Sequence, residues 1–285
     1  MAKIVTSCYA NHVGDPYWGQ MSRDLWYPAS LRSICGFGCP VVCYTDAGDR
    51  GYDQLTAFKE KNNLSNLTIK VYVLEDSPWF NRVLSIRRSD PEEYNDPDKL
   101  HRYHRSSVIY WSKFVFLHKE ADMGQNVFWI DCGLSHSGLF PGSMRSYDLE
   151  GVQNSYHYDL AFTPNTLKKI EDRVQGKIVV LCRSSTDADI LGLKKELGDF
   201  HAEAYPVGGF FGGSFDYLMK YITEAYALIH RLLLTDYLCN DEEISTYIVN
   251  KFPQWFSIWM FDTFYHEDWK DAYDPNQISF SNFFR

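Results

Sequence analysis

The sequence predicts an α/β fold with one mixed, mostly parallel sheet flanked by helices, in a single domain over residues 1–285. Three observations predict this fold. Short apolar runs typical of buried strands alternate with segments of helical periodicity. Hydrophobic residues make up 45% of the chain, which is enough to form a core. No Gly/Ser-rich or Pro-rich linker divides the chain.

The first third of the chain alternates strands and helices. A strand, helix, strand order requires a crossover that makes the two strands parallel, so the sheet is expected to begin with parallel strands. The expected strands lie at residues 3–9, 40–44 and 67–74, and the expected helices lie at residues 52–62 and in the second half of residues 17–34.

The rest of the chain is less regular. Residues 75–101 are rich in Pro, Asp, Asn and Arg and have no sustained period, which predicts an irregular loop or a lid. Beyond them the pattern predicts helices at residues 103–120 and 215–238, a further helix that begins near Asp241, a Gly-rich turn at residues 206–214, and strands at residues 125–130, 159–163 and 177–183. The tail from Trp255 is aromatic and acidic.

Charge and cysteine usage limit the function classes. The formal net charge of −9 argues against a broad basic face for nucleic acid, because phosphate binding depends on Lys and Arg. The seven cysteines lack CxxC spacing and favour a reducing, cytoplasmic location. Intervening Gly and Pro residues argue against a metal site at Cys35, Cys39 and Cys43. No secretory signal or membrane span is apparent, so a soluble protein is expected.

The sharpest local signal is the apolar run at residues 127–133, VFWIDCG, which ends in Asp131. The carboxyl ends of parallel strands form the ligand crevice of α/β proteins, and a carboxylate there can contact a metal ion or a hydroxyl. The alternative is that Asp131 caps the following turn. Ser7, Tyr9 and Asp46 end the first two expected strands and are predicted to lie beside it.

A second signal is the Gly-rich run PVGGFFGGS at residues 206–214, which leads directly into a helix. Its glycines would let the backbone approach a ligand closely, and its two aromatic rings would offer flat surfaces for a sugar or a base. The alternative is a tight strand-to-helix connection. The expected sugar or acceptor contacts are Gly208, Gly209, Phe210, Phe211, Gly212 and Gly213.

Charged residues on two expected helices complete the set of candidates. Asp241, Glu242 and Glu243 open a helix behind the natural N-cap Asn240, where acids would also complement the helix dipole. Capping is therefore the alternative to a catalytic role. Arg105 and Lys113 belong to a basic helix upstream of Asp131 and could reach a diphosphate, unless they are ordinary solvated side chains.

These three motifs, WIDCG, GGFFGG and NDEEI, resemble in order and separation those of GT-A glycosyltransferases. The GGFFGG string is similar to the loop of the blood-group A/B transferase family. The WID-x-G ending with a later acidic pair resembles the HtrL/YibB group of glycosyltransferases. The motifs extend from about residue 127 to about residue 250, and only the strand, helix, strand opening supports the resemblance in the N-terminal part.

The resemblance implies a GT-A-like domain, a nucleotide-sugar donor and an acceptor hydroxyl on a glycan or another molecule, with transfer of the hexosyltransferase class. Asp241 or Glu242 would be the general base of an inverting transfer, or would orient the donor in a retaining one. The implied donor-binding residues are Ser7, Tyr9, Asp46, Arg105, Lys113, Asp131 and Gly133.

The sequence departs from the family at the metal site. GT-A enzymes usually carry Asp-x-Asp, and here the second position is Gly133. Mn²⁺ or Mg²⁺ would then be held by Asp131, the donor diphosphate, waters and His266, with His136 as the second choice. Three other functions remain open: a glycoside hydrolase, a non-catalytic carbohydrate-binding protein of transferase-like fold, and a transferase acting on nucleic-acid bases, which the acidic charge disfavours.

Overall fold

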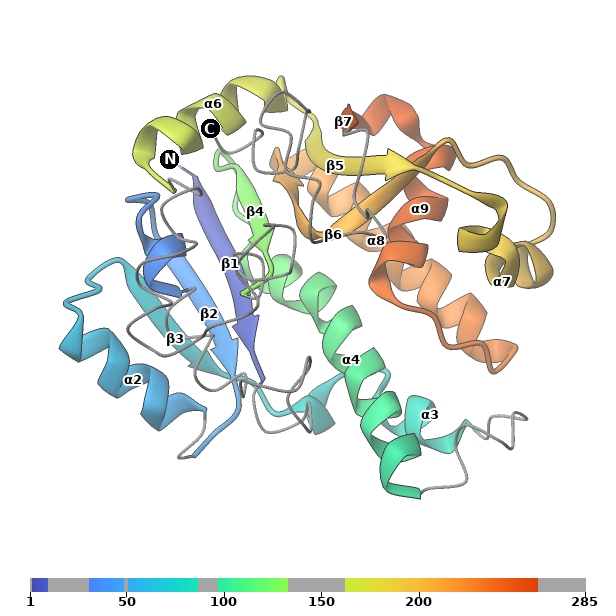
Figure 1. Cartoon of the computed structure of the whole chain (residues 1–285), viewed down its shortest axis with the longest axis horizontal. Coiled ribbons are helices and arrows are strands. Elements are labelled where there is room, and N and C mark those ends of the chain that lie inside the picture. Colours follow the sequence, from blue (N-terminus) through green and yellow to red (C-terminus); the bar gives the residue numbers. More distant parts are fainter. Residues whose placement is uncertain (1, 10–30, 49–50, 87–96, 133–161, 261–285) are drawn as a thin grey trace, which may run out of the picture.

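The computed structural model describes residues 2–9, 31–48, 51–86, 97–132 and 162–260. Its centre is a seven-stranded sheet with the order β3-β2-β1-β4-β6-β5-β7 (Figure 1). β6 is antiparallel to both of its neighbours, and all other pairs are parallel. The predicted mixed, mostly parallel sheet is therefore confirmed. The strands are β1 (Lys3–Cys8), β2 (Val41–Thr45), β3 (Leu67–Val71), β4 (Val127–Ile130), β5 (Ile178–Ser184), β6 (Ala204–Gly213) and β7 (Phe256–Met260).

Helices pack against both faces of this sheet, which explains why its central strands are almost continuously apolar. Every residue of β2 and β4 is buried. Successive residues of a strand enter opposite cores, so that Phe128 packs on one face and Trp129 on the other. The helices are α2 (Tyr52–Lys61), α3 (Phe80–Ser85), α4 (Pro97–Glu120), α6 (Pro164–Val174), α7 (Asp187–Leu197), α8 (Phe215–Leu234) and α9 (Asp241–Lys251).

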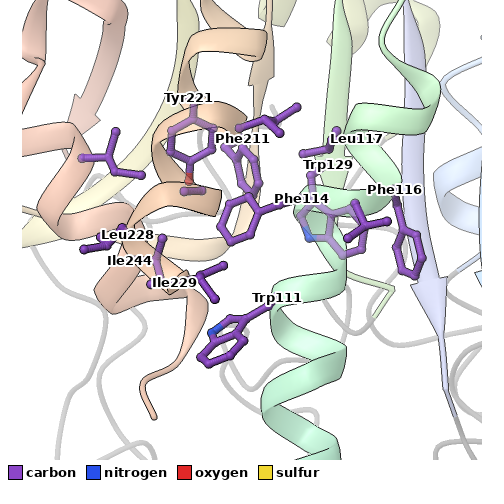
Figure 2. Packing of buried hydrophobic residues seen from close by; sticks show 14 of the residues in the cluster. Trp111, Phe114, Phe116, Leu117, Trp129, Phe211, Tyr221, Leu228, Ile229 and Ile244 are labelled. Atoms are coloured by element: carbon purple, nitrogen blue, oxygen red, sulfur yellow. The ribbon is translucent and has the colours of Figure 1, made fainter. Parts of the chain in front are cut away.

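The larger core lies between the sheet and α3, α4, α8 and α9. Its centre is aromatic: Phe114 of α4 and Phe211 of β6 both contact Tyr221 of α8, with ring centroids 5.7 and 5.4 Å apart (Figure 2). Burial of each such ring contributes about 1.5 to 3 kcal/mol relative to exposure. The smaller core, on the other face, receives side chains from α2 and α6.

Several predicted elements are confirmed and others are wrong. The predicted strands near residues 3–9, 40–44, 67–74, 125–130 and 177–183 and the helices near residues 52–62, 103–120 and 215–238 are present. Residues 75–101 are not irregular throughout, because they contain α3 and the start of α4, whereas residues 87–96 lie outside the described residues. Of the predicted strand at residues 159–163, residues 159–161 lie outside the described residues. Thr163 is the N-cap of α6 and accepts the Thr166 N–H (3.2 Å).

The prediction of a Gly-rich turn at residues 206–214 is also wrong, because residues 204–213 form β6, the strand between β4 and β5. Glycine is unfavourable in an isolated strand, but pairing on both sides outweighs that preference here. A Cβ on Gly212 would lie 2.3 Å from the Val127 carbonyl oxygen, so close strand packing explains this glycine. Among the described helices, none combines the length and apolar character needed to cross a membrane.

The carboxyl end of α4 is tied to three strands through Glu120, whose side chain is 6% exposed. Glu120 accepts a hydrogen bond from the Tyr44 hydroxyl of β2 (2.6 Å) and pairs with Lys70 of β3 and with Lys3 of β1 (3.5 Å). Burial alone would raise the pKa of Glu120, but the hydrogen bonds from Lys70 and Tyr44 outweigh burial and lower it. The network fixes α4 along the sheet.

We expect Glu120→Gln to lower the free energy of unfolding by about 1 to 3 kcal/mol at pH 7. A carboxyl whose pKa is lowered by folding stabilises the protein above its unfolded pKa, near 4.3, and loses that contribution as the pH falls through the lower folded value. Urea denaturation should therefore show a difference from wild type at pH 7 that shrinks below about pH 4.

Glu75→Gln is the matched control, since Glu75 forms an ion pair with Arg105 but is 47% exposed. Exposed pairs contribute about 0 to 1 kcal/mol, so this variant should differ little from wild type. Equal effects of the two variants would contradict the anchoring role of Glu120.

Candidate functional site

The site begins at the edge of the sheet where β1, β2, β3 and β4 all end. These strands are parallel and in register, so their carboxyl ends meet at one edge. Asp131 directly follows β4, and its N–H donates to the Gly209 carbonyl of β6 (2.8 Å), which continues the pairing of the two strands by one residue. The backbone of Asp131 is thus fixed at the predicted position.

The Asp131 carboxylate is held through one of its oxygens. The indole N–H of Trp129 donates to Oδ1 (2.6 Å), and the Lys113 ammonium lies 3.6 Å from the same atom. Trp129 and Asp131 are two residues apart along one strand direction, so both face the α4 side of the sheet. The Asp131 side chain is nevertheless 42% exposed, so a ligand can reach it.

Lys113 is the central residue of a charged cluster that it forms with Asp131 and Asp241. It lies on α4, which packs on β1, β4, α8 and α9, and its side chain is 3% exposed. Its ammonium donates a short hydrogen bond to Oδ2 of Asp241, in addition to its contact with Asp131, and lies 5.3 Å from the Trp129 ring centroid. Burial alone would lower the pKa of Lys113, but the charges of Asp131 and Asp241 outweigh burial and raise it. Lys113 is therefore a permanent buried cation.

Asp241 is the first residue of α9 and is 5% exposed. The end of α9 is capped by its neighbours: Asn240 Oδ1 accepts the Glu243 N–H (2.8 Å), and Glu243 Oε2 accepts the Asn240 N–H (3.0 Å). The capping interpretation is thus confirmed for Asn240 and Glu243. Asp241 instead faces Lys113. Glu242, the next residue, is half-buried, and its charge also acts on Lys113.

Two carboxylates and one ammonium make this cluster net negative. The pKa of Asp131 is raised, first because surrounding protein atoms desolvate its inner side and then because Asp241 is near, although Lys113 and the Trp129 hydrogen bond favour the charged form. The cluster can therefore accept hydrogen bonds from hydroxyl groups through the partly exposed Asp131 carboxylate, while Lys113 offsets part of its negative charge.

The predicted neighbours from β1 and β2 lie at the same edge, with Cys8 in register with Thr45. Ser7 is half-buried near the end of β1, and Asp46, which is 7% exposed, follows β2. Tyr9 differs from the expectation, because its ring is 1% exposed and its hydroxyl donates to the Tyr72 carbonyl (3.0 Å). Its ring belongs to the core and cannot stack on a ligand.

Arg105 is not brought into the cluster. Its guanidinium pairs with Glu75 (2.9 Å) and lies over the Phe80 ring, with 5.6 Å between the guanidinium carbon and the ring centroid. Along α4 it is eight residues, or about 12 Å, from Lys113. Of the two predicted cations, only Lys113 contacts the Asp131 carboxylate.

The Gly-rich segment offers no aromatic platform, so that expectation is wrong. Phe210 and Phe211 alternate across β6, enter the two opposite cores and are 0% and 3% exposed. Gly212 and Gly213 pair with the amino-terminal half of β4, away from Asp131. Gly209 is the glycine whose backbone contacts Asp131, and Gly208 precedes it.

The described residues alone do not fit Mn²⁺ or Mg²⁺. No group of three or more His, Cys, Asp or Glu within them is arranged to hold a metal ion. Asp241 is committed to Lys113, so Asp131 supplies the one partly exposed carboxylate of the cluster. Gly133, His136 and His266 lie outside the described residues, and their predicted roles stay predictions.

The thiols near this edge belong to the opposite core. Cys132 follows Asp131 and faces the other side of the sheet, where its sulfur lies 3.0 Å from that of Cys8, which in turn lies 3.5 Å from that of Cys43. All seven cysteines lie within the described residues, where they are buried and form no disulfide. Burial raises the pKa of Cys8 and Cys132, so these thiols stay protonated and behave as core residues.

Sequence reasoning missed Trp129 as a site residue. The signal that could have found it is its spacing from Asp131: on a strand, residues two apart share a face, so a tryptophan N–H can reach a carboxylate there. The contact between Lys113 and Asp241 joins residues 128 positions apart, and no local pattern reports it.

No protein-family model matches the chain, and neither does any curated protein. Among solved structures, galactosyltransferase LgtC in complex with donor and acceptor sugar analogues matches with a TM-score of 0.42 and 9% identity, over 90% of this chain and 72% of that chain. An active-site mutant of LgtC matches with a TM-score of 0.41 and 10% identity, over the same shares. At such low sequence identity, the similarity concerns the path of the chain alone. No comparison supports the finer resemblance to the HtrL/YibB group or to the blood-group A/B family.

Proposed function

We propose that this protein is a glycosyltransferase that moves a sugar from a nucleotide-sugar donor to an acceptor hydroxyl. The observation that carries the proposal is the cluster of Lys113, Asp131 and Asp241 at the carboxyl edge of the parallel strands. Burying a charged pair such as Lys113 and Asp241 is often less favourable for folding than apolar packing. Charged groups with shifted pKa values at such an edge are typical of functional sites.

Each charge has a use in glycosyl transfer. When the bond between the sugar C1 and the phosphate oxygen breaks, negative charge grows on the nucleoside diphosphate, and Lys113 would offset the repulsion between that charge and the carboxylates of Asp131 and Asp241. Asp131, which is partly exposed, would accept a hydrogen bond from a donor hydroxyl. Ser7 and Asp46 end adjacent strands and would complete the donor side.

The new bond between C1 and the acceptor oxygen requires loss of the acceptor proton. Of the two predicted bases, Asp241 is engaged with Lys113 and almost fully buried, whereas Glu242 is half-buried. We therefore assign the base of an inverting transfer to Glu242 and a supporting role for Lys113 to Asp241. In a retaining transfer Glu242 would orient the donor instead. Mn²⁺ or Mg²⁺ enters none of these steps.

The test is a melting-temperature panel of nucleoside diphosphates and nucleotide sugars, each with and without Mn²⁺, beside a panel of oligosaccharides. A nucleotide at 100 times its Kd should raise the apparent stability by about 2.7 kcal/mol. If oligosaccharides raise the melting temperature and no nucleotide does, the protein is a hydrolase or a carbohydrate-binding protein. A nucleotide effect that requires Mn²⁺ would locate metal ligands outside the described residues.

A further inference from the structure

We infer that Trp129 is a positioning residue, whose indole N–H fixes the Asp131 carboxylate in the orientation that meets the donor. The inference rests on the proposed function, because it gives Asp131 the donor-binding role assigned above. Trp129 itself is 2% exposed and meets no ligand directly.

The first observation concerns the hydrogen-bond acceptor of the Trp129 indole N–H. A tryptophan side chain has one polar donor, and in a core it usually finds a partner. Trp111 lies in the same core, is 0% exposed and donates to a backbone carbonyl, that of Cys239 (3.0 Å). Trp129 donates instead to a side chain that is 42% exposed. A buried group thus restrains a partly exposed carboxylate.

The second observation is that the Trp129 ring is itself held in place. It stacks against Phe116 of α4, with ring centroids 6.4 Å apart and planes at 22° (Figure 2). Lys113 lies near the same ring, 5.3 Å from its centroid. Rotation of the indole would disturb this packing, so the direction of its N–H is set by the core. Asp131 is therefore oriented by a rigid element, as a precise binding site requires.

The third observation is that both restraints on Asp131 fall on Oδ1. The Asp131 side chain is 42% exposed. We assign its second oxygen, Oδ2, to the contact with the nucleotide-sugar donor. The carboxylate would then offer one oxygen to one group, such as a sugar or ribose hydroxyl. Without the indole, the side chain would lose one of these two restraints, and part of the binding energy would be lost in ordering it.

The test compares Trp129→Phe with Trp111→Phe, which removes a matched indole N–H that does not touch Asp131. Uridine diphosphate and guanosine diphosphate are the probes, and calorimetry gives their Kd. Trp129→Phe should weaken binding about tenfold, the effect typical of losing a group that orients a ligand-binding side chain. Trp111→Phe should leave the Kd unchanged. In an Asp131→Ala background, where the acceptor of the indole N–H is gone, Trp129→Phe should cost no further affinity, because it acts through the Asp131 carboxylate.

A spectrum of protein labelled with ¹⁵N in its tryptophans tests the contact without a ligand. The Trp129 indole signal, identified by its loss in Trp129→Phe, should move in Asp131→Asn, and the Trp111 signal should not. An unmoved Trp129 signal overturns the inference. A loss of affinity in Trp129→Phe that persists in full in the Asp131→Ala background overturns it as well. If wild type binds neither these probes nor any nucleotide of the melting-temperature panel, the proposed function fails, and the spectrum still decides whether Trp129 orients Asp131. If Trp129→Phe does not fold, the Trp129 indole signal is assigned from triple-resonance spectra of uniformly labelled wild type, and the Asp131→Asn spectrum decides alone.

Discussion

Replacing Lys113 by methionine is expected to lower the free energy of unfolding by about 3 to 5 kcal/mol, because it leaves buried negative charge without its cation. Methionine keeps most of the apolar stem, so the loss reports the charge rather than a cavity. Asp241 is the more affected partner, since it is 5% exposed whereas the Asp131 side chain is 42% exposed and can be hydrated. Urea denaturation at pH 7 measures the change, and nucleotide binding should be lost with it.

The double variant Lys113→Met, Asp241→Asn separates stability from function. Removing both members of a buried ion pair is often nearly neutral, so this variant should recover most of the stability lost by Lys113→Met. It should not recover nucleotide binding, because the positive charge is still missing. A loss below about 1 kcal/mol in Lys113→Met would contradict the buried cluster, since that is the range of exposed pairs.

Glu242→Gln is expected to lower the rate of the chemical step by about a hundredfold or more if transfer is inverting, while donor binding changes little. Glutamine keeps the size of the side chain but cannot take a proton. Single-turnover hydrolysis of the nucleotide sugar that gives the largest melting shift measures the rate with water as the acceptor. Melting temperature and Kd, measured on the same sample, separate the rate from folding and from binding.

Glu243→Gln is the control, because Glu243 is the adjacent residue of α9, points about 100° away and belongs to the capping box. It should cost about 0.5 to 1 kcal/mol of stability and leave the rate unchanged. Similar small rate effects in both variants would exclude Glu242 as the base and leave Asp131 and Lys113 as the functional residues.

The parallel part of the sheet could be predicted because its strands are buried on both faces. Such strands are short runs of apolar residues, and β1, β2 and β4 carry this signal in their own sequence. β6 could not be predicted in the same way. Its glycines favour turns locally, and it becomes a strand because β4 and β5 pair with it from distant parts of the chain.

The same distinction applies to the site. Asp131 could be placed at the sheet edge because its position follows from the end of its own strand. The exposure of Phe210 and Phe211 was predicted wrongly. A turn would expose both rings, whereas neighbouring residues of a strand place their rings in opposite cores. The partner of Lys113 could not be predicted, since Asp241 meets it only after α4 and α9 pack together.

Lys113 and Glu120 together determine how α4 is seated on the sheet. They are seven residues apart, which is close to two full turns, so both lie on the same side of the helix. A slip of α4 by one turn, about 5.4 Å, would move both charges away from their partners at once. At about 3 kcal/mol for the contacts of Lys113 and at least about 1 kcal/mol for those of Glu120, the slipped arrangement would be populated in about 1 in 1,000 molecules or fewer. These two ionic contacts therefore add to the close packing of the apolar side chains of α4 in selecting a single alignment of the helix on the sheet.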